Sequence, residues 1–170
     1  APIRFAVSSG HGVGKSVLVA MLTCWIMSTR KFAQGTITAN TITQLDTKTW
    51  ARVRLWASMC LTGHWFEINS EKMYHKAHPS SWFCSKQSSK EENSESFSGQ
   101  HAENSTSFYF NDEDSGIAQI IHEVEEGGLT AGESMQVLFG NATRATGSFH
   151  HACFGSLRNR YIVNVVDSRE

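Results

Sequence analysis

Short apolar segments alternate along the chain with longer segments in which apolar residues recur at helical spacing. The short segments are apolar or β-branched and predict strands at Ile3–Ser8, Thr36–Ala39, Trp82–Cys84, Thr106–Phe110, Met135–Phe139 and Tyr161–Val166. The longer ones predict helices from Lys15 to about Ser28, from Thr43 to about Leu61, and over Ile117–Val124, the last ending near Gly127-Gly128. Strands alternating with helices indicate an α/β fold with a mostly parallel central sheet flanked by helices.

Two polar stretches interrupt this pattern. Ser85–Ser107 is rich in Ser, Glu, Asn and Lys and predicts a long surface loop. A loop of this length in a compact domain is usually functional or mobile. The acidic run Glu123–Glu126 predicts a solvated helix end.

The composition is that of one globular domain. The chain has 170 residues, 40% of them hydrophobic, with five Trp, and a domain of this size buries roughly 70% of its unfolded surface. The five Trp are expected mainly in the core rather than stacked on bases, because three of them sit in predicted helices at core spacing. The four Cys are scattered, which predicts buried thiols rather than disulfides.

Net charge and hydropathy exclude few classes of function. The formal net charge of −1 leaves a local basic patch open, so it decides neither for nor against nucleic acid. No apolar run approaches the roughly 20 residues that span a bilayer, so no membrane association is expected. Residues 1–170 are expected to be a single domain and, because a strand stands at each end, a fragment of a longer chain.

The segment Ser8-Ser-Gly-His-Gly-Val-Gly-Lys-Ser16 follows a predicted strand and opens a predicted helix, which is the setting of a phosphate-binding P-loop. The glycines let successive backbone N–H groups point at phosphate oxygens, and the helix adds its positive N-terminal end. Lys15 would reach the β- and γ-phosphates, and the Ser16 hydroxyl would bind Mg²⁺. The pattern departs at Ser9, where Gly is usual. The expected nucleotide-binding residues are Gly10, His11, Gly12, Val13, Gly14, Lys15 and Ser16.

A second strand ends in acids, as a P-loop ATPase requires. Phe108-Tyr-Phe-Asn-Asp-Glu113 is apolar up to Asn111 and then presents Asp112, expected to hold Mg²⁺, and Glu113, expected to polarise the attacking water. The alternative is a pair of surface acids after a strand.

A third strand also ends in polar residues. Asn141 follows it and is placed to sense the γ-phosphate or the attacking water, and Arg144 is a candidate finger that neutralises charge. Arg158, Arg160 and Arg169 compete with Arg144 for that role, and for any one Arg a solvated surface position is the alternative.

With these motifs in place, the sequence resembles the ATPase domain of the terminase large subunit, the motor that packages DNA into the heads of tailed phages. The resemblance covers nearly the whole chain, and its motifs occur in the order of the family. They are Gly10-His-Gly-Val-Gly-Lys-Ser16, Thr38-Ala-Asn-Thr-Ile-Thr-Gln44, Glu91-Glu-Asn-Ser-Glu-Ser-Phe-Ser-Gly-Gln100, Ser105-Thr-Ser-Phe-Tyr-Phe-Asn-Asp-Glu113, Phe139-Gly-Asn-Ala-Thr-Arg144 with Gly147, and Val166-Asp-Ser-Arg-Glu170.

The resemblance implies an ASCE-type P-loop ATPase that uses ATP and Mg²⁺. Lys15 would bind phosphate, Ser16 and Asp112 would hold the metal, Glu113 would be the catalytic glutamate, and Asn141 would lie in the motif that couples hydrolysis to movement. The implied partners are double-stranded DNA, a portal ring and a small terminase subunit, with the chain itself in a homo-oligomeric ring during packaging. The implied location is the host bacterial cytoplasm and, transiently, the prohead portal. The nuclease domain that large terminases carry is not expected within this segment.

The sequence departs from that family at four positions. Relatives have an apolar residue at 111, a small residue at 114 and Pro at 142, where this chain has Asn111, Asp114 and Ala142. The extra acid Asp114 would raise the pKa of a neighbouring carboxyl. His11 stands where many terminases have Arg in the P-loop, so charge neutralisation must come from elsewhere or from a neighbouring subunit.

Two alternatives remain from the sequence. A helicase-like P-loop ATPase is disfavoured, because Asp112-Glu113-Asp114-Ser115 ends in Ser where the DExD/H box requires Asp or His. The other is a fragment of a degenerate prophage terminase that binds nucleotide or assembles without turning over. The motif Thr38–Gln44 likewise has two interpretations: a coupling element, or a simple helix cap by Thr41 or Thr43.

Overall fold

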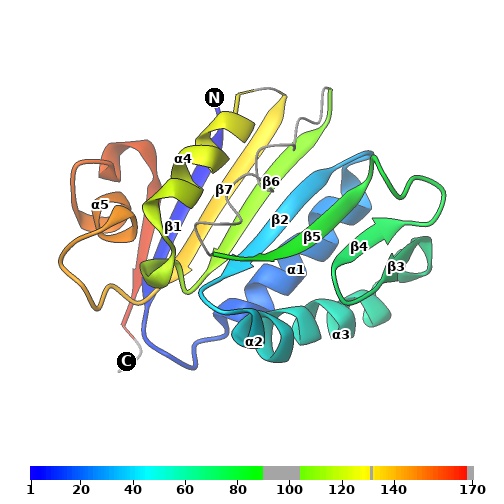
Figure 1. Ribbon diagram of the computed structural model, residues 1–170, viewed down its shortest axis with the longest axis horizontal. Helices are drawn as coiled ribbons and strands as arrows, with labels where there is room; N and C mark the ends of the chain where they lie inside the picture. Colours follow the sequence, from blue (N-terminus) through cyan, green and yellow to red (C-terminus); the bar gives the residue numbers. More distant parts are fainter. Residues whose placement is uncertain (90–103, 131, 168–170) are drawn as a thin grey trace.

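The centre of the molecule is a sheet whose strands are mostly parallel (Figure 1). The computed structural model describes residues 1–89, 104–130 and 132–167, and within these ranges the sheet has eight strands in the order β3-β4-β5-β2-β6-β7-β1-β8. Their bounds are β1 (Ile3–Ser9), β2 (Gln34–Ala39), β3 (Phe66–Ile68), β4 (Lys72–His75), β5 (Phe83–Ser88), β6 (Thr106–Asp112), β7 (Glu133–Gly140) and β8 (Ile162–Val166). In this order, neighbouring strands pair in parallel from β5 through β2, β6, β7 and β1 to β8. At the other edge, β4 pairs antiparallel with both β3 and β5.

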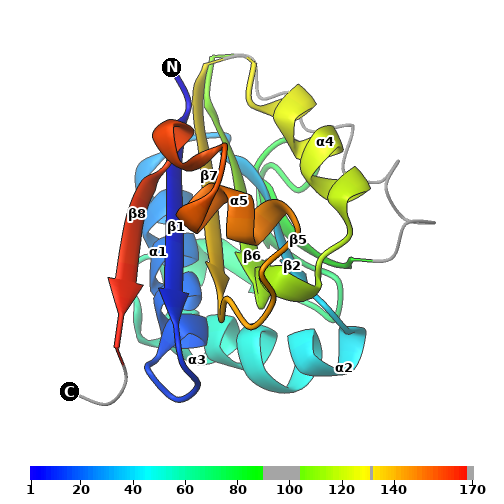
Figure 2. The same cartoon turned by 90° about the vertical axis from the view of Figure 1, so that its left-hand side faces the viewer.

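Helices cover both faces of this sheet. In Figure 1, α1 (Lys15–Thr29) lies behind the strands, and α4 (Gln119–Gly128) and α5 (Ser148–Phe154) lie in front; the side view of Figure 2 shows the same layers. A second helical segment packs against α1 and consists of α2 (Ile42–Gln44), the π-helical η1 (Leu45–Trp50) and α3 (Ala51–Met59). Single turns of 3₁₀ helix are η2 (Gly63–Trp65), η4 (Asp114–Gly116) and η5 (Arg158–Arg160).

The core lies between the central strands and α1. All seven residues of β6 are buried, as expected for a central parallel strand covered on both faces. Ile37 of β2, Phe108 and Phe110 of β6 and Met27 of α1 belong to one apolar cluster. Gly35 of β2 lies against the ring of Phe108, so the two neighbouring strands fit together only because residue 35 has no side chain.

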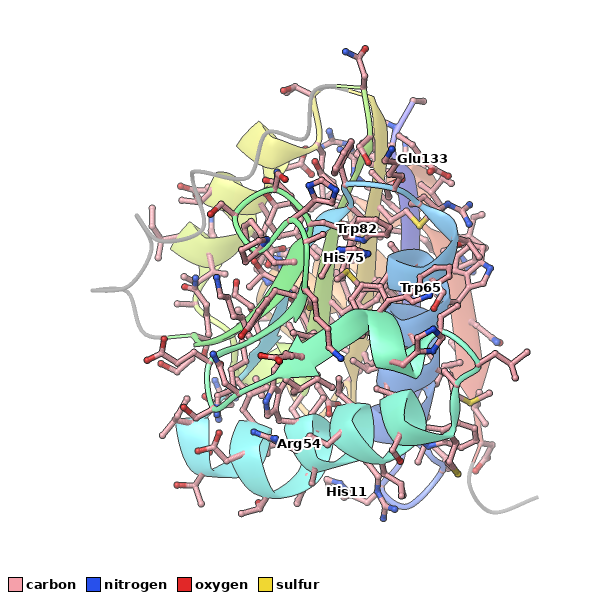
Figure 3. The ribbon with its side chains drawn as sticks, turned by 90° about the vertical axis from the view of Figure 1, so that its right-hand side faces the viewer. His11, Arg54, Trp65, His75, Trp82 and Glu133 are labelled. Atoms are coloured by element: carbon pink, nitrogen blue, oxygen red, sulfur yellow. The ribbon has the colours of Figure 1, made fainter. Side chains whose placement is uncertain are left out.

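The β3–β4 hairpin and α5 were not predicted from the sequence. The hairpin strands have three and four residues, too few to show a period. Aromatic packing holds the hairpin in place. The ring of His75 stacks on Trp82 (both labelled in Figure 3) with centroids 4.3 Å apart. Phe66 meets Trp82 edge to face. Helix α5 has only seven residues, with His150 and His151 inside it, so its apolar pattern is weak.

The strands and helices that were predicted are all present, with corrections at several ends. The predicted loop from Ser85 is wrong up to Ser88, because these residues continue β5 and pair with β2, whereas Trp82 precedes the strand. Residues 90–103, with most of that loop and the motif Glu91–Gln100, lie outside the described ranges. The single helix predicted from Thr43 to Leu61 contains a π-helical segment and ends at Met59.

Two further expectations hold only in part. Trp50 and Trp82 are buried, but Trp25 and Trp65 are 44% and 38% exposed, so the prediction of a core role is wrong for these two. The four Cys are free thiols as predicted, with Cys60 half-buried and the other three buried. Among the described helices, none combines the length and the apolar character needed to cross a lipid bilayer.

Candidate active site

The predicted site residues meet where the parallel strands end. The P-loop follows β1, Asp112 is the last residue of β6, and Asn141 directly follows β7. Strand β7 lies between β6 and β1, which is consistent with the predicted ASCE-type fold. Ligands of open α/β sheets bind at this edge, beyond the carboxyl ends of the strands. In Figure 2 the loop after β1 and the helices α2 and α3 lie together at this end of the molecule.

The P-loop has the backbone conformation that a phosphate cradle needs. Gly12 and Gly14 have φ of 79° and 86°, in the left-handed region that glycine adopts without strain. A Cβ at either position would meet no atom within 4 Å, so the requirement for glycine is conformational rather than steric. Helix α1 begins at Lys15, immediately after Gly14, and directs its free N–H groups toward the loop.

Lys15 is held inside the loop. Its Nζ donates to the carbonyl oxygen of Gly10 at 2.6 Å and to that of Ser9 at 3.4 Å, and the residue is buried. A cavity of about 660 Å³ opens over the loop. The predicted residues from His11 to Ser16 all line it, together with Glu113.

The P-loop and the acidic strand end are joined directly. Ser16 Oγ donates to Oδ2 of Asp112 at 2.7 Å, and Thr49 Oγ1 donates to the same oxygen at 2.7 Å. Hydroxyl and carboxylate oxygens are the hard ligands that Mg²⁺ prefers. Ser16 and Asp112 therefore fit the metal that the sequence motifs imply.

Glu113 has a strained backbone. Its φ and ψ are 61° and 49°, a left-handed conformation that is uncommon for residues other than glycine and concentrates at functional sites. The side chain is 24% exposed, and its Oε1 lies 3.9 Å from Nδ1 of His11. Glu113 also lines a second cavity of about 330 Å³ beside the first. Figure 3 shows His11 at this end of the molecule, beside the helix that leads into α3.

The candidate arginines separate by position. Arg144 is exposed and lines the second cavity with His11 and Glu113. Arg160 instead faces Glu126 of α4 at 3.7 Å, and Arg158 lies in the same 3₁₀ turn, η5, away from the P-loop cavity. Arg169 lies outside the described residues. Of the predicted fingers in the described ranges, only Arg144 stands beside Glu113.

Asn141 stands at the end of β7 but lines neither cavity in the described part of the chain. Its carbonyl oxygen accepts a hydrogen bond from the N–H of Thr143 at 2.8 Å, which turns the chain toward Arg144. The structure thus places Asn141 beside the site and brings Thr143 and Arg144 into the second cavity.

Sequence reasoning missed a group of polar residues on the helix opposite the P-loop. Gln44, Lys48 and Arg52 recur every four residues and line the P-loop cavity; Gln44 and Lys48 also line the second cavity. The four-residue spacing within a predicted helix was the available signal. Thr41 caps the helix start by accepting from the N–H of Gln44, so the predicted cap is present, and a coupling role of Thr38–Gln44 stays a prediction.

The unusual Asn111 is explained by a buried partner. Asn111 is fully buried, and its Nδ2 donates to Glu125 Oε2 of α4 at 3.1 Å. Gln136 Nε2 of β7 donates to the same oxygen at 2.7 Å, and the Tyr161 hydroxyl donates to Gln136 Oε1 at 2.8 Å. The prediction of a solvated helix end at Glu123–Glu126 is therefore wrong for Glu125, which is fully buried.

The unusual Asp114 belongs to the same buried region. Its Oδ1 lies 3.3 Å from Nε2 of His122, whose Nδ1 lies 3.9 Å from Glu125. Burial raises the pKa of Asp114 to about 8 and that of Glu125 to about 7, and it lowers the pKa of His122. Asn111 and Asp114 thus flank the acidic pair with buried polar groups on the α4 face of the sheet.

The comparisons with known proteins identify the fold. No family model matches the chain, and no curated protein matches it in sequence. Solved structures of the large terminase from a thermophilic bacteriophage are similar, with TM-scores of 0.71 for crystal form 2, 0.66 for crystal form 3, and 0.68 for crystal form 3 in complex with ADP. The sequence identity is 10% in each comparison, and each match covers 96% of this chain.

The chain spans about 40% of the length of those terminase structures. At this identity the likeness concerns the fold, and it confirms the predicted α/β class with a mostly parallel sheet flanked by helices. The resemblance to large terminases that the motifs indicated is thereby confirmed at the level of the fold.

Proposed function

We propose that this chain is the ATP-hydrolysing motor domain of a viral DNA-packaging terminase, which couples hydrolysis of Mg-ATP to movement of double-stranded DNA into a prohead. The observation that carries the proposal is the hydrogen bond between Ser16 and Asp112, which joins the P-loop to the acidic end of β6. A glycine-rich turn with an incidental lysine would have no reason to meet a buried carboxylate at the end of another strand.

Each residue has a chemical task in this proposal. The N–H groups of the P-loop and the Lys15 ammonium bind the phosphates, and Ser16 and Asp112 hold Mg²⁺. When bound, the metal neutralises charge on the phosphate oxygens. Glu113 lines both cavities and accepts a hydrogen bond from the attacking water, which orients that water and makes it more nucleophilic.

The finer parts of the proposal concern coupling. Asn141 and Arg144 follow β7, and Arg144 lines the second cavity. A change in the bound phosphates on hydrolysis would therefore move the segment that follows β7. Arg144 is exposed, so as a charge-neutralising finger it could act on the phosphates of its own site or on those of a neighbour in a homo-oligomeric ring. A portal ring and a small terminase subunit would be the further partners, and the place of action would be the cytoplasm of the infected bacterium.

The test measures nucleotide binding and phosphate release separately, with Glu113→Gln as the variant and Glu123→Gln as the control. Gln keeps the shape of Glu113 but cannot act as a base, so we expect turnover to fall at least a hundredfold, roughly the contribution of a general base, while ATP affinity stays within a few-fold. Glu123 is an exposed acid of α4, and its loss should change neither quantity. Undiminished turnover in Glu113→Gln would overturn the role of Glu113.

The same measurements distinguish the motor from the non-catalytic alternative. A chain that binds Mg-ATP but releases no phosphate at any protein concentration, with or without double-stranded DNA, is a non-catalytic nucleotide-binding module. A chain that binds neither ATP nor ADP overturns the proposal altogether.

A further inference from the structure

The helix opposite the P-loop contains a π-helical segment, η1, between α2 and α3. Such segments are rare and occur often at functional sites, because the wider turn changes which side chains face a given direction. The segment is firmly anchored. Asp46 forms an ion pair with Lys86 of β5, and Trp50 Nε1 donates to the carbonyl oxygen of Asn69 at 3.0 Å. Arg54, labelled in Figure 3, donates to the carbonyl oxygens of Ile68 and Asn69.

Within this segment, Thr49 points inward. It is 0% exposed, and its hydroxyl donates to Oδ2 of Asp112, the oxygen that also accepts from Ser16. A hydroxyl that donates its hydrogen still has two lone pairs. The hydroxyls of Ser16 and Thr49 therefore fix the rotation of the Asp112 carboxylate, and each adds an oxygen atom with free lone pairs next to it.

A purely structural hydroxyl would find a nearer partner. Thr23, equally buried in α1, donates to the carbonyl oxygen of Val19 one turn away, which is the usual solution for a helical threonine. Thr49 instead bonds to a carboxylate 63 residues away in the chain, and that carboxylate is itself only 2% exposed.

We propose that Thr49 is a positioning residue of the metal site: through its hydrogen bond to Asp112 it holds the carboxylate in the orientation that binds Mg²⁺. Residues that orient metal ligands typically change metal affinity 10- to 100-fold when they are lost. Because Lys48 and Arg52 of the same helix line the phosphate cavity, Thr49 also ties that helix to the metal. The inference rests on the proposed function, since it assumes that Ser16 and Asp112 bind Mg²⁺ with a nucleotide.

The experiment measures the affinity for fluorescently labelled ADP with Mg²⁺ and with EDTA. The dissociation constant in EDTA divided by the one with Mg²⁺ reports the contribution of the metal alone. Thr49→Val keeps the shape and removes the hydroxyl, and we expect it to reduce this ratio about 10- to 100-fold. Thr49→Ser restores the hydroxyl and should keep the ratio within about threefold of the wild type. Thr23→Val removes a buried threonine hydroxyl that bonds within α1, and it should leave the ratio unchanged.

The outcomes separate the inference from the proposed function. If the wild type binds labelled ADP with no effect of Mg²⁺, both fail. If the wild type shows a metal effect and Thr49→Val retains it in full, only the role of Thr49 is overturned. Should Thr49→Val fail to fold, Thr49→Ser decides with Thr49→Ala: an equal metal ratio in those two variants would show that the hydroxyl has no part in metal binding.

Discussion

Ser16 and Asp112 share a hydrogen bond of 2.7 Å although 96 residues separate them in the chain. The bond places the start of α1 against the end of β6. We expect Ser16→Ala to weaken Mg²⁺-dependent nucleotide binding by roughly tenfold or more, because it removes a metal-binding oxygen and leaves Asp112 with one donor. Titration of labelled ADP with and without Mg²⁺ measures this, and Ser28→Ala, which removes a hydroxyl at the far end of α1, is the control. An unchanged metal dependence in Ser16→Ala would contradict the assignment.

Lys48 supplies a cation where the P-loop has His11 in place of Arg. It lines both cavities beside Glu113, so under the proposed function its charge would act on the phosphates of ATP from within the same chain. We expect Lys48→Gln to weaken ATP binding about tenfold at low salt and less at high salt, because an exposed charge is screened. Lys48→Arg should preserve binding, and Lys76→Gln, at an exposed position after β4, should have no effect. A loss that is the same at all salt concentrations would argue against an electrostatic role.

Glu125 makes stability depend on pH. Its pKa is raised by burial from 4.5 to about 7, so the folded protein keeps a proton that the unfolded chain releases. This group therefore contributes stability below about pH 4.5 that is lost as the pH rises to 7. Glu125→Gln is neutral at every pH and keeps an oxygen for Asn111 and Gln136. The charged or titratable side chains that act on Glu125 are Asp114, His122, Tyr109 and Tyr161.

The measurement is the free energy of unfolding in urea at several pH values between about 5 and 8, the range that brackets the folded-state pKa. We expect the stability of Glu125→Gln relative to the wild type to increase by about 2–3 kcal/mol across this range, the value of a shift of this size. Glu123→Gln, at an exposed position in the same helix, should follow the wild type. If Glu125→Gln also follows the wild type, Glu125 is ionised in the folded protein at neutral pH.

Two glycines should respond oppositely to the same substitution. A Cβ at Gly35 would lie 2.2 Å from the Phe108 ring, so Gly35→Ala should destabilise the fold by about 1–3 kcal/mol through overpacking between β2 and β6. A Cβ at Gly127 of α4 would meet nothing within 4 Å, and Gly127→Ala should stabilise the helix by about 0.5–1 kcal/mol. Thermal unfolding compares the two. Phe108→Leu combined with Gly35→Ala should recover part of the loss, and its failure to do so would place the clash elsewhere.

The parts of the fold that the sequence predicted are those with a local signal. Buried parallel strands such as β6 are apolar over most of their length, and the P-loop is defined by glycine, lysine and serine within a single short segment. The β3–β4 hairpin gave no such signal, since its strands are short and their aromatic partners, such as Trp82, come from outside them.

The rest of the site depends on contacts between distant segments. Thr49 bonds to Asp112 from within a π-helical segment, which helical periodicity does not predict. Asn111 departs from the family pattern of an apolar residue, and its buried partner could not be foreseen because Glu125 was predicted to lie in solvent. Arg144 and Lys48 could be recognised as charged, but their position beside Glu113 required the assembled sheet edge.

The place of β1 in the sheet bears on when the loop after β1 can form during synthesis. Strand β2 pairs with β5 on one side and β6 on the other, whereas β1 pairs with β7 and β8, and Ile3 pairs with Met135. A ribosome therefore releases β1 long before its partners exist, and parallel pairing over such a distance is slow to form. We therefore expect the loop that follows β1 to become ordered only after β7 and β8 have been made. We expect a nascent chain that stops short of these two strands to lack an ordered loop after β1 and, under the proposed function, to bind no nucleotide.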